Sequence, residues 1–324
     1  MTLILSFFLR AISILATLVT LVSGVIAPPA ESFHAKDEAA LKTTFSVISD
    51  VHMETNNLDR FTTFRKSLQD MNRAKRNDML LMLGDNTMNA QGTEYLMLYS
   101  HLAAYNKLFT LAAMGNHDIN EGENKPKDAI ARHNRFLNAY PYSLYYNEAY
   151  SCTMHAITDS PEDLYYFVVL GSEGAAGTNA YISPEQLAFL EEPVAEASAN
   201  GNPLFVACHQ PLNTKAGNWW GEGGKLGEQS DAVEAILKSY PGKVFFFSGH
   251  LHNAFDSYPN HVSDNITMVD LPCFTGESGT GGGQLTGKGY GYQVEVYEDT
   301  VLLRGRNFMN GEWVDSMEFS FPAK

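Results

Sequence analysis

Metal-competent side chains recur in this chain at one kind of position, directly after a short apolar run. Five motifs have this setting: "SDVH", "GDN", "GNHD", "CHQP" and "GHLH". Their polar residues are Asp50, His52, Asp85, Asn116, His117, Asp118, His209, His250 and His252. Carboxylate, imidazole and amide donors together suit borderline divalent metals such as Mn, Fe or Zn. The pattern therefore predicts a divalent metal site.

Each motif alone is weak, because a single histidine after a strand is more often a structural core residue. The ordered set of five, each behind an apolar run, is hard to explain as coincidence. The remaining histidines lack this context and are interpreted as structural or surface residues: His34, His101, His133, His155 and His261.

The elements that must position these motifs alternate between short apolar runs and amphipathic stretches. Apolar runs at 45–50, 79–85 and 108–118 are separated by stretches with helical spacing. This βαβαβ order predicts an α/β domain with a parallel sheet. Ligands bind at the carboxyl ends of the strands in such sheets, so the five motifs should meet in one crevice. Within a strand, residues two apart share a face, which would let Asp50 and His52 bind one ion together.

The C-terminal part changes character. Segments 292–299, 301–308 and 312–321 alternate as β-strands do, and Asn310–Gly311 is a hairpin turn signal. They predict a β meander, and no internal repeat or convincing linker interrupts the chain. We expect one domain over residues 45–324.

The N-terminus has a composition of its own. Residues 1–27 carry Arg10 as their single charge, followed by a long apolar stretch. This is typical of a signal peptide or a membrane anchor. Residues 28–44 are interpreted as a linker. The segment predicts a secreted or extracytoplasmic protein, with membrane association if it is not cleaved.

The net charge of −15 disfavours binding to nucleic acid. The cysteines and tryptophans lead to two further predictions. Cys208 is interpreted as a core residue, whereas Cys152 and Cys273 could pair in an exported protein. Adjacent indoles in the glycine-rich loop 214–229, Trp219 and Trp220, are candidate substrate-binding residues.

The five ordered motifs resemble those of the calcineurin-like metallophosphoesterases, over residues 45–252. The resemblance implies a four-layer αββα sandwich with two divalent metal ions. By motif, one ion would be held by Asp50, His52 and His252, the other by Asn116, His209 and His250, and both by Asp85. His117 would face the leaving group as a proton donor, with Asp118 orienting its ring.

The implied chemistry is metal-dependent hydrolysis of a small phosphoester. Two ions about 3.5–4 Å apart would polarise the phosphoryl group and lower the pKa of a bridging water toward about 7, and the resulting hydroxide would attack phosphorus. "GNHD" with "GHLH" is also similar to class III cyclic-nucleotide phosphodiesterases, which favours a phosphodiester substrate. A phosphomonoesterase or nucleotidase, or a metal-stabilised binding module without turnover, are the alternatives. Met88 stands where the purple acid phosphatase branch has tyrosine, so we do not expect a purple enzyme.

Overall fold

The computed structural model describes residues 32–119, 126–157, 160, 163–174, 179–216, 224–257, 259–276 and 282–324. The expected signal peptide or anchor at 1–27 lies outside the described residues, as do Trp219 and Trp220. Among the described helices, none combines the length and apolar character that a membrane span requires.

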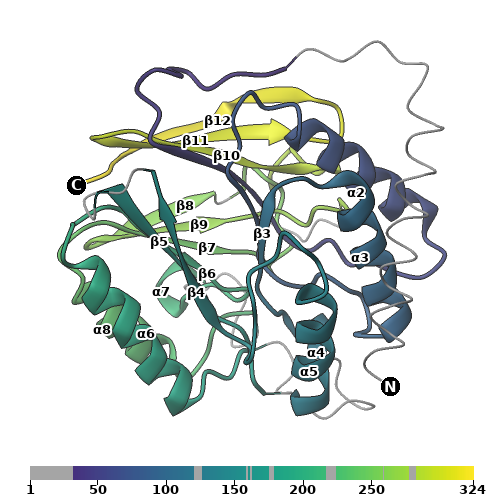
Figure 1. The fold of residues 1–324 in the computed structure, drawn as a ribbon, viewed down its shortest axis with the longest axis horizontal. Coiled ribbons are helices and arrows are strands. Elements are labelled where there is room, and N and C mark those ends of the chain that lie inside the picture. Colours follow the sequence, from purple (N-terminus) through teal and green to yellow (C-terminus); the bar gives the residue numbers. More distant parts are fainter. Residues whose placement is uncertain are drawn as a thin grey trace.

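Two six-stranded sheets lie face to face at the centre of the molecule (Figure 1). The first has the order β12-β11-β10-β1-β2-β3, in which β1, β2 and β3 are parallel and β10, β11 and β12 form an antiparallel meander. The strands are β1 (Thr43–Ile48), β2 (Met79–Met82), β3 (Phe109–Ala112), β10 (Tyr290–Val296), β11 (Thr300–Asn307) and β12 (Glu312–Pro322). The predicted C-terminal meander is thus confirmed, with Gly311 in the left-handed conformation at its last turn.

The second sheet has the order β4-β5-β6-β7-β9-β8. Strands β5, β6, β7 and β9 run parallel, and β4 and β8 pair antiparallel at its two edges. Its strands are β4 (Ser151–Ala156), β5 (Leu164–Val169), β6 (Leu204–Ala207), β7 (Val244–Ser248), β8 (Asn260–Ser263) and β9 (Ile266–Asp270).

Helices cover the outer face of each sheet (Figure 1). On the first sheet these are α2 (Leu58–Met71), α3 (Gly92–Tyr105) and α5 (Pro126–Leu137). On the second they are α6 (Pro184–Ala197) and α8 (Ser230–Lys238). Two short helices, α4 (Asn116–Ile119) and α7 (Asn213–Ala216), directly follow strand ends.

Alternation along the buried strands builds two cores. On β7, Phe245 and Phe247 face the core between the sheets, whereas Val244 and Phe246 face the core beneath α6 and α8. Phe45 of β1 joins the sheets, with its ring centroid 5.1 Å from that of Phe167. Removing such a ring would cost about 3–5 kcal/mol of folding free energy. The four-layer αββα sandwich expected from the sequence is confirmed.

The segment before β1 does not behave as the expected linker. Phe33 forms a β-bridge with Ala74, and its ring lies beneath the guanidinium of Arg306 at 3.9 Å and edge-on to Trp313 at 5.3 Å. Phe33 is half-buried, and its contacts with Arg306 and Trp313 tie the segment to the meander. The ordered domain therefore begins before residue 45.

Candidate metal centre

The carboxyl ends of the parallel strands of both sheets meet at one place. The backbone N–H of Asp50, after β1, donates to Gly84 O after β2 at 3.1 Å. On the second sheet, Gly249 N donates to His209 O at 2.9 Å. The sheets are joined by His250 N, which donates to the Asp50 carboxylate at 3.1 Å. Sequence motifs that are far apart along the chain are therefore brought together.

The backbone at the centre is left-handed, which the sequence reasoning did not foresee. Strands β1 and β7 end before the motif residues, and φ is 57° at Asp50, 45° at His52, 49° at Asp85, 71° at His250 and 50° at His252. The expectation that strand alternation places Asp50 and His52 on one face is therefore wrong. Each such conformation costs about 1–3 kcal/mol and is concentrated at functional sites in proteins.

Two glycines leave room for the buried carboxylates. A Cβ atom at Gly115 would lie 2.1 Å from Asp85 Oδ1, and one at Gly249 would lie 2.5 Å from Asp50 Oδ2. Any other residue at these positions would displace a carboxylate. The glycines of "GNHD" and "GHLH" are thus required by close approach.

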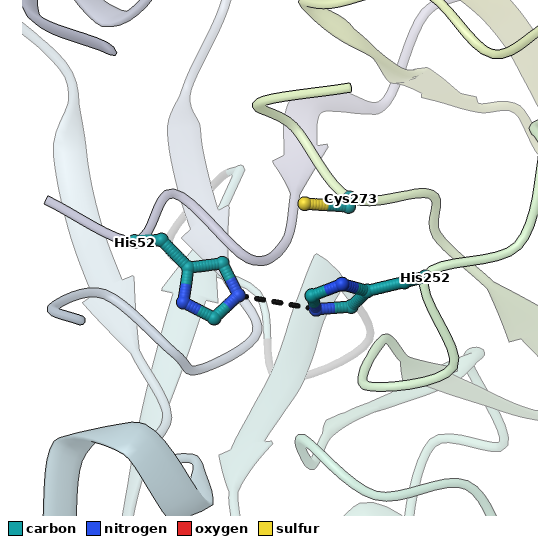
Figure 2. A group of neighbouring side chains, drawn as sticks. All are labelled: His52, His252 and Cys273. Atoms are coloured by element: carbon teal, nitrogen blue, oxygen red, sulfur yellow. Dashed lines mark hydrogen bonds between the residues drawn. The ribbon is translucent and has the colours of Figure 1, made fainter. Parts of the chain in front are cut away.

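Four residues, Asp50, His52, Asp85 and His252, form what we call the first cluster. Their ligand atoms all lie within 4.8 Å of one another. His252 Nε2 lies 3.0 Å from Asp50 Oδ1 and 3.1 Å from His52 Nε2, and Figure 2 shows the two imidazole rings with these nitrogens directed at each other. The first three residues are buried, and the side chain of His252 is 25% exposed.

The second cluster consists of Asp85, His209 and His250, whose ligand atoms also lie within 4.8 Å of one another. His209 Nε2 is 3.1 Å from Asp85 Oδ2 and 3.2 Å from His250 Nδ1. Asp85 belongs to both clusters. Near it, Asn116 Oδ1 is buried without a hydrogen-bond partner among the described residues. An unpaired oxygen of this kind fits a residue that faces a cation.

The charges of the two clusters are strongly coupled. Burial raises the pKa of Asp50, but the imidazoles of His209 and His252 hold it well below its usual range. Asp85 is also held below its usual range, mainly by His209, against the effect of burial. Burial lowers the pKa of His252, but Asp50 raises it to about 11. Burial and the charge of His209 lower the pKa of His250 to about 3. Both carboxylates therefore stay charged at neutral pH and attract cations.

His117 lies at the edge of the first cluster. Its ring is edge-on to that of His52, with 4.7 Å between centroids, and its Nδ1 lies 2.8 Å from Met88 O. Because a carbonyl can only accept, Nδ1 carries the proton and Nε2 is left for another partner. The backbone N–H of His117 donates to Asp85 Oδ1 at 2.8 Å, which ties the residue to both clusters.

Asp118 does not orient the His117 ring, so that sequence-based assignment is wrong. The backbone carbonyl oxygen of Met88 accepts from His117 Nδ1 instead. The fully buried Asp118 carboxylate instead accepts hydrogen bonds of 2.9–3.3 Å from Asn86, Thr87, Tyr95 and Gly115. These donors belong to the loop after β2, to α3 and to the loop after β3. Asp118 therefore fixes the loop that carries Asp85.

The structure confirms the predicted position of one cysteine and differs from expectation for the other two. All three are free, so Cys152 and Cys273 form no disulfide. Cys208 is buried in the core beneath α6 and α8, as predicted. Cys273 groups with His52 and His252, a position that the sequence analysis missed. It follows the apolar strand β9, and the rule applied to the five motifs would have found it.

Comparison with known proteins agrees with this geometry. A model of the calcineurin-like phosphoesterases matches residues 43–254, and the chain belongs to this family. It is 27% identical over 132 residues to a "Manganese-dependent ADP-ribose/CDP-alcohol diphosphatase" of Oryza sativa subsp. japonica. The match covers 40% of this chain and 36% of the rice protein.

Solved structures share the fold at low sequence identity. A dimetal phosphatase from Danio rerio superposes with a TM-score of 0.59 at 14% identity, covering 88% of this chain and 100% of the other. A purple acid phosphatase from yellow lupin superposes with a TM-score of 0.57 at 14% identity, covering 86% and 53%. At this identity the likeness concerns the fold alone.

Proposed function

We propose that this chain is a two-metal hydrolase of small phosphodiesters or diphosphates. The observation that carries the proposal is the place of Asp85 in both ligand clusters. One carboxylate with two oxygens can hold two ions close together, the arrangement by which paired metals act on phosphoesters.

The ligand assignment combines the two clusters with the position of Asn116. Asp50, His52 and His252 would hold one ion, Asn116, His209 and His250 would hold the other, and Asp85 would bridge them. When bound, the two ions polarise the phosphoryl oxygens and lower the pKa of a bound water toward about 7. The unpaired Oδ1 of Asn116 supports its inclusion, because a buried amide oxygen without a donor gains most from a cation.

His117 is assigned to the leaving group. With Nδ1 donating to Met88 O, the ring presents Nε2 away from that carbonyl. A protonated Nε2 can donate to the departing oxygen. Because a metal-bound water would supply the nucleophile, the reaction needs no covalent bond to the protein. The side chain of Met88 stands where purple enzymes have tyrosine, which supports a colourless metal centre.

Two observations support the proposed substrate class, the sequence motifs and the name of the rice relative. The "GNHD" and "GHLH" motifs favour a diester, and the rice relative is named for diphosphates that carry a nucleoside. We therefore propose a substrate that carries a nucleobase. The indole rings of Trp219 and Trp220 would stack on this base. The negative net charge argues against nucleic-acid substrates. The apolar residues 1–27 favour export, with or without membrane anchoring.

The test is hydrolysis by the purified full chain supplied with Mn²⁺, Zn²⁺ or Fe²⁺. Bis(p-nitrophenyl) phosphate and ADP-ribose should be cleaved faster than p-nitrophenyl phosphate, and Asp85→Ala should abolish all three activities. Faster cleavage of the monoester would identify a phosphomonoesterase instead. Two bound ions with no turnover of any ester would identify a binding module.

A further inference from the structure

Cys273 places a sulfur atom beside the two histidines of the first cluster. Its Sγ and the ligand nitrogens of His52 and His252 all lie within 4.8 Å of one another. Figure 2 shows the sulfur alongside the two facing imidazole rings. The side chain is 2% exposed, so this thiol belongs to the interior of the site rather than to its surface.

Backbone pairing fixes the position of this cysteine. Cys273 forms a β-bridge with Ser49, and the following residue, Phe274, donates its N–H to Ser49 O at 3.0 Å. The sulfur lies 3.6 Å from Asp50 O and 3.2 Å from Thr275 Oγ1. The thiol is therefore held next to Asp50, which supplies one of the two carboxylates of the first cluster.

The spacing of the two imidazoles suits a shared metal ion. Two imidazole nitrogens at 2.0–2.1 Å from zinc lie about 3.4 Å apart. His52 Nε2 and His252 Nε2 are 3.1 Å apart, and Asp50 Oδ1 is 3.0 Å from His252 Nε2. With sulfur at about 2.3 Å, and with the two carboxylates of the first cluster, the ion would have two nitrogen, two oxygen and one sulfur donor. Sulfur favours Zn²⁺ and softer ions over Mn²⁺.

We propose that Cys273 is a metal ligand of the first cluster and gives it a preference for thiophilic divalent cations such as Zn²⁺ and Cd²⁺. This inference rests on the proposed two-metal function and adds a sulfur donor to it. As the sulfur–metal bond forms, the thiol proton leaves to solvent, and no electrons are transferred. The Thr275 hydroxyl is then placed to donate to the thiolate, as an outer-shell partner of a metal ligand does.

The experiment is a Cd²⁺ titration of the metal-free full chain, monitored by the ultraviolet charge-transfer absorption of a cadmium–thiolate bond. Wild type should develop this absorption with one equivalent of Cd²⁺, and Cys273→Ser should not. The affinity for Cd²⁺ should fall by at least about tenfold in that variant. Cys152→Ser is the matched control, because Cys152 lies on β4 at the far edge of the second sheet, and it should behave as wild type.

X-ray absorption spectroscopy of zinc-loaded wild type identifies the atoms bound to the metal. It needs no variant, so its result does not depend on whether Cys273→Ser folds. A sulfur neighbour at about 2.3 Å is expected. Only nitrogen and oxygen neighbours, or equal cadmium absorption in Cys273→Ser and wild type, would overturn the proposal. Hydrolysis of the chromogenic diester by Mn²⁺-loaded wild type is measured alongside. If hydrolysis persists without a sulfur ligand, the Cys273 assignment alone fails, whereas loss of both points to the two-metal function itself.

Discussion

The first and second clusters share Asp85 but differ in charge. The first has a second carboxylate, Asp50, and the thiol of Cys273 beside it. Among the described residues, the second cluster has Asp85 as its one carboxylate, and its remaining donors are two imidazoles and the proposed amide oxygen of Asn116. Because ion binding in a buried site scales with the opposing charge, the first cluster should bind its ion more tightly. The second ion then depends on Asp85 far more than the first does.

Replacing the shared residue, Asp85, should have the largest effect and tests the difference between the two clusters most strongly. Asp85→Ala should empty the second cluster and weaken the first, because each loses a bridging oxygen and a negative charge. Activity should fall by at least about 10³-fold, since metal activation supplies several kcal/mol of transition-state stabilisation. Metal analysis of purified protein, with His52→Ala as a comparison that should mainly lose one ion, checks this. An active Asp85→Ala protein that holds two ions would refute the bridging role.

His117 tests whether the two clusters suffice for turnover. His117→Ala should retain both ions and lose about 10²–10⁴-fold in kcat on alkyl or ribose esters, whose leaving groups need a proton. The loss should be clearly smaller on nitrophenyl esters. Steady-state kinetics with both substrate types is the measurement. A uniform loss would instead assign His117 to charge stabilisation, and a loss of metal would give it a structural role.

Replacing Asp118 tests how far both clusters depend on the loop that carries Asp85, because Asp118 holds this loop in place. Asp118→Asn should lower metal affinity about 10–100-fold, because the loop carrying Asp85 loses its anchoring acceptor. The free energy of unfolding should also fall, by about 1.5–3 kcal/mol for the loss of a charged hydrogen-bond acceptor. Calorimetric metal titration and chemical denaturation measure these effects. Kinetic effects should not depend on the leaving group, and a dependence like that of His117→Ala would restore the orienting role.

Replacing Trp219 and Trp220 should have the smallest effect, since an indole is not a metal ligand and the two residues are proposed only to contact the base of the substrate. Replacing both by alanine should raise KM by about tenfold for a base-containing substrate, the loss expected for base stacking. KM for bis(p-nitrophenyl) phosphate should change less. Kinetics on both substrates decides the matter, and equal changes would exclude selection of a nucleobase by this loop.

The sequence could predict what depends on periodicity and on strand order. The parallel order of β1, β2 and β3 follows from apolar runs that alternate with helical stretches, and it brings their motifs to one edge. The sequence could not predict the left-handed backbone at Asp50 or His250, which arises from contacts between the two sheets. The partners of Asp118 were missed because Tyr95 and Thr87, which are distant in sequence, meet it only in the folded chain.

Electron paramagnetic resonance of the Mn²⁺-loaded protein tests the central claim most directly. If Asp85 bridges two ions, the first equivalent of Mn²⁺ should give the spectrum of an isolated ion, and the second should convert it to that of an exchange-coupled pair. Asp85→Ala should never show the coupled spectrum. Two equivalents of Mn²⁺ that remain magnetically independent in wild type, or saturation at one ion per chain, would contradict the shared-carboxylate centre.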